Sequence, residues 1–446
     1  MKTTRALSLM ASGSLVLALA ACGGDTGDTG DTGGGADEGG STEEGDSAAG
    51  EDVTISWWHN SNTGEGLEYY EQVAADFEDA NPGVTIQMEA MQHEDMLTQL
   101  DAAFQAGDAP DVYMERGGGE LADHVEAGLT KDLTDDAAEE IELLGGTVQG
   151  WTVDDRVYAL PFSVGVVGFW YNTEMFEEAG ISEPPSTWDE MYDAIDQLKA
   201  AGMEPVSVGA GDKWPAAHYW YQFSLRHCSE EVLTDAVQSL DFSDQCFIRA
   251  GEEVEQLIAA EPFNRGFLST PAQSGPTSAS GLLATEQVAM EMQGHWEPGV
   301  MAGLTEDGEG LGDKLGWFPF PEVEGGEGDP EAQLGGGDAW GVSEDAPQEA
   351  VDFVKYMLSD EVQRGFAERD MGLPTNPNVT DAVADPALAQ LLEVRDSAPY
   401  VQLYFDTAFG QSVGGAMNDA IALMFADQAT PQDIVDDTQA AADAQG

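Results

Sequence analysis

Polar and aromatic side chains gather in loops that directly follow short apolar runs of this sequence. The candidates for contact with a ligand are His59, Asn60, Glu115, Arg116, Ser163, Lys213, Trp214, His295, Trp296, Asp338, Trp340 and Gln411. Tryptophan at a loop tip exposes apolar area, which is normally avoided unless the ring covers something. Indole rings stack on the C–H faces of sugars, while carboxylates, amides and arginine bind the surrounding hydroxyls. These residue types therefore predict a cleft for a polyhydroxylated ligand.

Metal and catalytic motifs are missing from the sequence around these loops. The six histidines show neither a His-Glu-x-x-His spacing nor a Cys/His cluster, so we expect no metal and no cofactor. We expect a binding protein and not an enzyme. An exported carbohydrate-active enzyme remains an alternative, because it needs only two carboxylates across a cleft. With 85 acidic residues such pairs arise by chance, so their presence does not decide the question.

Alternating strand and helix patterns position the first of these loops. Residues 53–58, 84–88 and 110–114 are predicted strands, and the segments between them carry apolar residues at helical spacing. This alternation predicts an α/β fold with a parallel sheet and helices on its faces. Ligands of such sheets bind at the carboxyl ends of the strands. We therefore expect His59, Asn60, Glu115 and Arg116 at one edge of a sheet.

Three extended segments are predicted to cross between two lobes. Pro161 is expected to end a strand of the first sheet, 162–163 to form a hinge and 164–171 to begin a second sheet. Residues 316–321 and 371–374 are the second and third predicted crossings. The expected architecture is two discontinuous α/β lobes with a multi-segment hinge and a ligand cleft between them. The expected first lobe is 52–161 with 319–371, and the second is 162–318 with 372–446.

The N-terminus has the pattern of an exported lipoprotein. Lys2 and Arg5 precede a short apolar stretch that closes on Leu19-Ala-Ala-Cys22, so 1–21 is a predicted lipoprotein signal peptide and Cys22 the lipidated residue. Residues 22–51 are a predicted disordered, acidic and Gly-rich tether. We expect attachment to the extracytoplasmic face of the cell membrane through this lipid alone. Because proteins outside the cytoplasm fold under oxidising conditions, Cys228 and Cys246 are predicted to form a disulfide.

The charge of the chain restricts its partners. A formal net charge of −70 disfavours nucleic acid and anionic lipid as partners. Such a surface suits high salt, where screening removes the self-repulsion.

Eight short motifs follow one another in order along the chain. They are Leu19-Ala-Ala-Cys22, Ile55-Ser-Trp-Trp-His59, Ala109-Pro-Asp-Val-Tyr113, Tyr158-Ala-Leu-Pro161, Trp170-Tyr-Asn172, Pro185-Ser-Thr-Trp-Asp189, Met290-Glu-Met-Gln-Gly-His-Trp296 and Gly335-Gly-Gly-Asp338. In this order they resemble the carbohydrate-binding proteins of bacterial ABC importers, with the maltose-binding protein as a distant relative. The resemblance implies a monomeric type II periplasmic-binding-protein fold that captures an oligosaccharide and delivers it to permease subunits in the membrane.

The resemblance also implies roles for individual residues. By position, Glu115, Trp214 and Trp296 match sugar contacts of the family. The maltose-binding protein has a carboxylate just after the first crossing, and Ser163 and Val164 take that place here. Maltose is therefore not the implied ligand. A binding protein for a non-sugar solute such as a polyamine remains an alternative, because acids and tryptophans also suit a cation.

Overall fold

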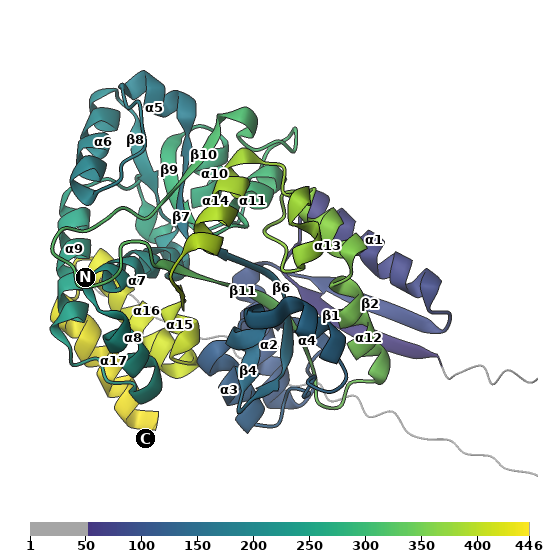
Figure 1. Cartoon of the computed structure of the whole chain (residues 1–446). Coiled ribbons are helices and arrows are strands. Elements are labelled where there is room, and N and C mark those ends of the chain that lie inside the picture. Colours follow the sequence, from purple (N-terminus) through teal and green to yellow (C-terminus); the bar gives the residue numbers. More distant parts are fainter. Residues whose placement is uncertain (1–51, 446) are drawn as a thin grey trace, which may run out of the picture. The chain divides into compact units, whose positions relative to one another are not determined.

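The computed structural model describes residues 52–445 of the chain. These residues form two main β-sheets, each with helices around it (Figure 1). The first sheet has the strand order β12-β11-β3-β1-β2, with β6 also paired to β11, and the second has the order β10-β7-β9-β8. The strands of the first sheet are β1 Val53–His59, β2 Val84–Ala90, β3 Val112–Glu115, β6 Ala159–Val166, β11 Gln333–Val342 and β12 Val401–Leu403. Those of the second are β7 Gly168–Asn172, β8 Glu204–Ser207, β9 Val288–Gln293 and β10 Leu315–Pro319. A short hairpin joins β4 Thr152–Val153 to β5 Arg156–Val157.

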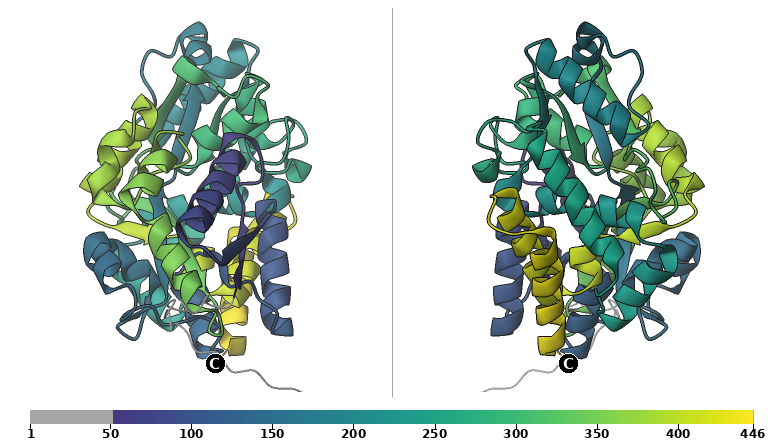
Figure 2. Two further views of the ribbon diagram at one scale, coloured as in Figure 1. Left: turned by 90° about the vertical axis from the view of Figure 1, so that its right-hand side faces the viewer. Right: turned by 90° about the vertical axis from the view of Figure 1, so that its left-hand side faces the viewer.

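Helices and strands alternate from β1 to β3, as the α/β pattern predicts, and further helices surround the sheets (Figure 2). Those that come before β9 are α1 Gly64–Ala80, α2 His93–Ala106, α3 Gly118–Glu126, α4 Ala138–Leu144, α5 Thr173–Ala179, α6 Trp188–Ala200, α7 Trp214–His227, α8 Glu230–Ser239, α9 Gln245–Ala259 and α10 Ala279–Ala284. Those that follow β9 are α11 Glu297–Leu304, α12 Gln348–Met357, α13 Asp360–Ala367, α14 Pro386–Ser397, α15 Phe405–Ala408, α16 Gln411–Phe425 and α17 Pro431–Gln445.

The first sheet begins as the sequence predicts. β1 pairs in parallel with β2 and with β3, and alternate residues of β1 such as Ile55 and Trp57 are fully buried. Helix α1 covers them with Tyr70, Val73 and Phe77, which recur at helical spacing. The carboxyl ends of β1 and β3 therefore lie at the same edge of the sheet, where the loops at 60–63 and 116–117 follow.

The prediction that Pro161 ends a strand is wrong. β6 continues through Pro161 to Val166, and it pairs antiparallel with β11 over this whole length. The register of that pair shifts between Asp338 and Ala339, where Pro161 is opposite Ala339 and Ser163 is opposite Asp338. A proline is tolerated at such a bulge because the ladder is already interrupted there.

The segment at 316–321, predicted as the second crossing, stays with the second sheet. Residues 315–319 form β10, which pairs antiparallel with β7, and Phe318 and Phe320 pack into the core of the second lobe. The chain returns instead through β11, whose Leu334 belongs to the core around α7 and whose Trp340 belongs to the core around β1. The aromatic, proline-rich run was misleading because a buried edge strand has the same composition as an extended linker.

The third predicted crossing, 371–374, lies against β6. The backbone amide of Val164 donates to the carbonyl of Leu373 at 3.3 Å, and Ser163 forms an isolated bridge with Pro374. Three extended segments thus pass side by side between the lobes. We propose that the lobes divide near Ser163, within 335–339 and near 372, in place of a return at residue 319.

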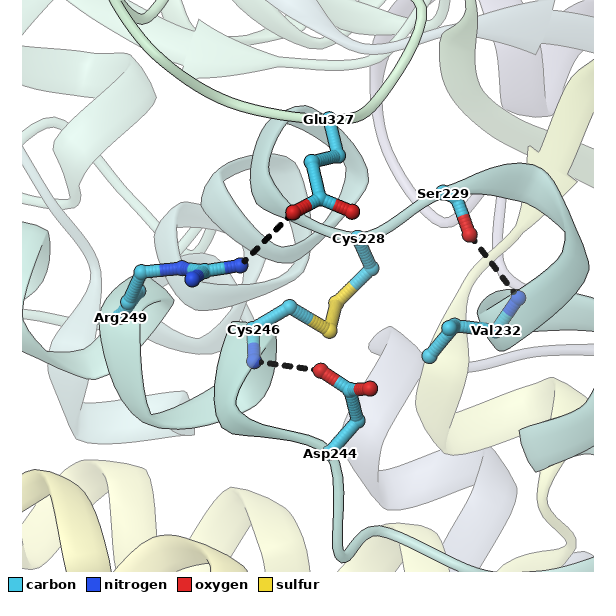
Figure 3. The surroundings of a disulfide bond; sticks show 7 residues. All are labelled: Cys228, Ser229, Val232, Asp244, Cys246, Arg249 and Glu327. Carbon is cyan, nitrogen blue, oxygen red and sulfur yellow. Dashed lines mark hydrogen bonds and ion pairs between the residues drawn. A yellow bond between two sulfur atoms is a disulfide. The ribbon is translucent and has the colours of Figure 1, made fainter.

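Cys228 and Cys246 form a disulfide in the second lobe (Figure 3). Their Cα atoms are 5.1 Å apart, and the bond ties the end of α7 to the start of α9 across α8. Asp244 caps α9 by accepting a hydrogen bond from the Cys246 amide at 2.8 Å. The bridge thus holds together the helices that pack behind the second sheet.

Replacing both cysteines, Cys228→Ser with Cys246→Ser, is expected to lower the free energy of unfolding by about 3 kcal/mol, because the closed loop spans 18 residues. Denaturant titration measures this loss, and a reductant should affect only the parent protein. In a Cys22→Ser background, a thiol assay under denaturing conditions should detect no free thiol before reduction and two afterwards. Free thiol before reduction would contradict the pairing.

Candidate functional site

A cavity of about 1150 Å³ lies between the two lobes. Its walls come from the loop after β1, the start of α2, the residue after β3, the starts of α7 and α11, and the segment around α15 and α16. The hinge strands contribute Phe162, Ser163 and Asp338. The volume slightly exceeds the roughly 300–1,000 Å³ of ordinary small-molecule sites, so a ligand of several rings fits.

Nine of the residues predicted as ligand contacts line this cavity. They are Asn60, Arg116, Ser163, Lys213, Trp214, His295, Trp296, Asp338 and Gln411. They come from both lobes and from the hinge, so the fold brings together side chains that are far apart in the sequence. Trp214, which we expected on a loop, is the first residue of α7 and still faces the cavity.

His59, Glu115 and Trp340 lie outside the cavity lining. His59 is fully buried against Trp57, and its Nδ1 accepts a hydrogen bond from the amide of Ser61 at 3.2 Å. Burial lowers the pKa of His59 to about 3, so this ring is neutral. The ring thus supports the loop after β1 through its hydrogen bond with Ser61.

Glu115 and Trp340 support the cavity from behind. The carboxylate of Glu115 accepts from the Gly117 amide at 3.1 Å and lies 2.8 Å from Nδ1 of His124. It therefore anchors the glycine turn that follows β3. Trp340 is buried and stacks on Phe162, with ring centres 4.3 Å apart, so it backs an aromatic ring that does line the cavity.

Four aromatic rings form one wall of the cavity. His218 stacks on Tyr404 with centroids 5.1 Å apart, and Trp214 lies 5.1 Å from His218. Trp296 meets Trp214 at 6.3 Å and Tyr404 at 6.5 Å, both edge to face. Because each ring touches at least one other, the set of Trp214, His218, Trp296 and Tyr404 is held in place before any ligand enters. We call this set the aromatic wall.

Several buried polar atoms on the cavity residues have no hydrogen-bond partner within the described part of the chain. They are Glu94 Oε2, Arg116 Nε, His218 Nδ1, His295 Nδ1, Trp296 Nε1 and Tyr404 Oη. Buried polar atoms are normally paired, since leaving one unpaired costs about 1–3 kcal/mol. A group of them around one cavity indicates a ligand that offers both donors and acceptors.

The protonation of His295 follows from its neighbours. Ser163 Oγ has one proton, and it donates to the carbonyl of Leu373 at 3.0 Å. His295 Nε2, 2.8 Å from the same oxygen, must then be the donor, which leaves Nδ1 as an acceptor. Burial lowers the pKa of His295 to about 3, so the ring is neutral at pH 7. His295 therefore ties the second lobe to two of the hinge segments.

A charged cluster lies at the first-lobe side of the cavity. Arg116, just before α3, forms an ion pair with Glu120 in the first turn of that helix, and it lies 3.8 Å from Asp406 of the second lobe. Asp338 lies on the hinge strand, and its carboxylate has no hydrogen bond to any residue between 52 and 445. Burial raises the pKa of Asp338 to about 6, although the charge of Arg116 opposes this.

Polar contacts join the two lobes across the cavity. The indole Nε1 of Trp214 donates to Glu94 at 2.9 Å, and the amide of Gln411 donates to Asp101. Together with Arg116 and Asp406, these pairs show that the lobes meet around the cavity in this structure.

At two places the backbones of the two lobes are in direct contact, because the residue there is glycine. A Cβ atom on Gly119 of α3 would lie 2.6 Å from the amide nitrogen of Gly410 and 2.9 Å from the carbonyl of Ala408. On the α1 side, a Cβ on Gly64 would lie 3.1 Å from the Cα of Gly303. Backbone therefore meets backbone at these rims of the cavity, an approach that a larger residue at 119 would prevent.

Residue types suited to metal binding do not come together here. Between residues 52 and 445, no group of three or more His, Cys, Asp or Glu side chains could hold a metal ion. The expected lipidation site at Cys22 and the tether lie outside the described residues. Within 52–445 no helix is both long enough and apolar enough to cross a membrane.

Sequence reasoning missed several cavity residues, chiefly His218, Tyr404 and Asp406. His218 is inside a helix that is buried on every side, where a core role is the ordinary interpretation. Tyr404 and Asp406 follow β12, a strand of only three residues that carries too short a pattern to recognise. Its position after a strand end was the one signal that could have singled out Tyr404.

Comparison with known proteins shows similarity along most of the chain. Binding proteins of Brucella abortus are 29% identical over 169 residues, which covers 37% of this chain and 40% of theirs. The diacetylchitobiose binding protein DasA of Streptomyces coelicolor is 23% identical over 403 residues, 87% of this chain and 86% of DasA. A solved chitin oligosaccharide binding protein superposes with a TM-score of 0.79 at 26% identity, covering 89% of this chain and 99% of that one.

The structural neighbours include type II periplasmic binding proteins, so the two-lobed α/β architecture expected from the sequence is confirmed. The sequence pattern of one family, described as bacterial extracellular solute-binding protein, matches residues 60–364. This match runs from the residue after β1 into α13, so it leaves out β1 and β12 of the first sheet, and it includes most of the cavity residues. The chain is a member of the bacterial extracellular solute-binding protein family.

Proposed function

We propose that this protein captures an oligosaccharide outside the membrane and delivers it to the permease of an ABC importer. The observation that carries the proposal is the cavity between the lobes, where the aromatic wall faces unpaired buried donors and acceptors. Sugar rings supply apolar faces for the aromatic wall and hydroxyls for the polar atoms. The protein binds the sugar as a monomer, and its two lobes close on the sugar by rotating about the three hinge segments.

The names of the relatives support a carbohydrate ligand. DasA is a diacetylchitobiose binding protein and the superposed structure is a chitin oligosaccharide binding protein. Both alignments cover most of this chain. The proposal is binding without turnover, in keeping with a family of solute-binding proteins.

A polyamine fits the unpaired atoms less well than a sugar. A protonated polyamine has only N–H donors, so it cannot accept hydrogen bonds from Arg116 Nε or Trp296 Nε1. Sugar hydroxyls both donate and accept, and can pair with those two atoms as well as with His295 Nδ1. The carboxylates and the aromatic wall alone would suit either ligand.

A thermal-shift screen at high salt tests the proposal. Mono- and oligosaccharides, with diacetylchitobiose and longer chitin oligosaccharides first, are compared with spermidine and putrescine. A ligand that binds only the native state raises the melting temperature. A shift with a polyamine and none with any sugar would overturn the proposal, and so would release of sugar fragments in stoichiometric excess over protein.

We also propose that Cys22 carries the lipid that holds the protein at the extracytoplasmic face of the membrane. Mass spectrometry of the N-terminal peptide should show a chain that begins at Cys22 with a diacylglyceryl modification. The Cys22→Ala variant should lose this mass and leave the membrane fraction. A mature N-terminus elsewhere, without lipid, would contradict the proposal.

The aromatic wall yields a prediction on affinity. Trp214→Ala and Trp296→Ala are each expected to weaken sugar binding tenfold or more, about 1.4 kcal/mol, because each removes a stacking surface. Isothermal titration calorimetry measures the loss, and thermal melting checks that the fold is intact.

Two further variants separate the causes. Trp214→Phe keeps a ring but loses the hydrogen bond to Glu94, so it isolates the contribution of the cross-lobe contact. Trp220→Phe changes a buried core tryptophan outside the cavity and should leave affinity unchanged. Unchanged affinity in both alanine variants would remove the argument from the aromatic wall.

Closure yields a second prediction. Gly119→Ala places a methyl group against the backbone of 408–410, so the lobes cannot reach the spacing seen here. We expect sugar affinity to fall about tenfold, because the closed state becomes less populated. Small-angle scattering with saturating sugar should show a larger radius of gyration than for the parent protein.

The chain provides a matched control for this variant. Gly146 lies in the first lobe, and a Cβ atom added there would have nothing within 4 Å, so Gly146→Ala makes the same chemical change away from the rim. It should bind sugar like the parent protein. Full affinity and full compaction in Gly119→Ala would show that closure does not need this contact.

A further inference from the structure

The ionisable side chains that line the cavity are unequal in sign. Eight carboxylates line it, from Glu65, Glu94, Asp212, Glu306, Asp307, Asp338, Asp406 and Asp419, against three cations, Arg116, Lys213 and Arg369. The imbalance alone repeats the acidic character of the whole chain. What matters for a ligand is whether any of the cations is available to bind an anion.

Each of the three cations is already engaged by a carboxylate. Arg116 pairs with Glu120 and lies 3.8 Å from Asp406. Lys213 pairs with Asp419, and Arg369 lies 3.3 Å from Glu65 with its guanidinium over the ring of Tyr69. An incoming anion would have to displace one of these carboxylates or remain unpaired.

The histidines of the cavity do not supply a positive charge that could bind an anion. Burial lowers the pKa of His93 and of His218 to about 4, and that of His295 to about 3. All three rings are therefore neutral at pH 7, where they can accept or donate hydrogen bonds but do not attract an anion.

Asp338 differs from the other carboxylates of the cavity in its position. It lies on the hinge strand β11 at the register shift opposite Ser163, where a bulge redirects a side chain. The charges of Arg116 and Glu120 act on its pKa in opposite directions, Arg116 lowering it and Glu120 raising it. Burial raises the pKa of Tyr70 and Tyr404 well above their usual value, and the charge of Asp338 adds to the effect for both cavity residues.

The carboxylate of Asp338 has no hydrogen-bond partner among residues 52–445, and Asp338 lines the cavity. A hydroxyl or an ammonium group of a ligand would pair with it. A carboxylate or phosphate group placed there would meet a like charge in a partly desolvated site, which is a strongly unfavourable contact.

From these contacts we infer that the cavity selects uncharged or amino-bearing oligosaccharides against acidic ones such as uronic-acid oligosaccharides, and that Asp338 is the residue that imposes this selection. The inference rests on the proposed function and narrows its ligand class. It depends on the pairing of the cavity cations and on the position of Asp338, and not on the net charge of the surface.

Matched pairs of sugars test the inference on the full-length protein. Cellobiose, galactobiose and diacetylchitobiose are compared with cellobiouronic acid, digalacturonate and the glucuronate-containing hyaluronan disaccharide by calorimetry at pH 7. Every pair is measured in about 0.15 M and about 1 M salt, because the Debye length falls from about 8 Å to about 3 Å between them. We expect the neutral member to bind at least tenfold more tightly in both salts.

Asp338→Asn should reduce the affinity gap, the ratio of the affinity for the neutral sugar to that for the acidic sugar, at least threefold. Most of this change should come from tighter binding of the acidic sugar. Glu306→Gln is the matched control, since it removes the same charge from an exposed residue at the cavity rim and should leave the gap unchanged in 1 M salt. Thermal melting confirms that both variants fold.

The outcomes separate the inference from the proposed function. Equal or tighter binding of an acidic sugar, loss of the gap in 1 M salt, or an unchanged gap in Asp338→Asn would each overturn the selection while sugar binding stands. Binding of no neutral and no acidic sugar would overturn the proposed function, and the selection with it.

Discussion

The antiparallel pair of β6 and β11 is the constraint on which the rest of the structure depends. These two strands share one ladder from Ala159–Gly341 to Val166–Gly335. At one end Leu160 and Trp340 pack in the core of the first lobe, and at the other Val166 and Leu334 pack in two apolar clusters of the second lobe. Leu373 adds a third strand of backbone at Ser163 and Val164. Because backbone hydrogen bonds run through the crossing, the lobes can rotate about it without either core being disrupted.

The same crossing forms the floor of the cavity. Phe162 and Ser163 come from β6, and Asp338 comes from the facing position of β11, next to the one shift in the register of the pair. Trp340 stacks on Phe162 and His59 packs against Trp57, so the cavity floor is backed by buried aromatic rings. A site on paired strands is better fixed than one on free loops, and this leaves the lobes as the moving parts.

The walls above this floor use two different kinds of interaction. The aromatic wall is assembled entirely from the second lobe, where rings hold one another in place. The first lobe contributes charged and amide groups, and they reach across to the second lobe through Arg116, Glu94 and Asp101. Stacking on one side and hydrogen bonding on the other match the two surfaces of a sugar ring.

Local sequence patterns were sufficient for much of this description. The apolar alternation of β1 and the helical spacing of α1 identified the α/β class, and the tryptophans at 214 and 296 identified two rings that line the cavity. Each of these signals lies within a few neighbouring residues. Only the tertiary structure decided which strand-end side chains face the cavity. Glu115 and Trp340 turn into the core, whereas Tyr404 and Asp406 reach the cavity from a C-terminal segment that packs back across it. The physical reason is that burial depends on contacts between residues hundreds of positions apart, such as Arg116 with Asp406 or β6 with β11, and no local pattern records them.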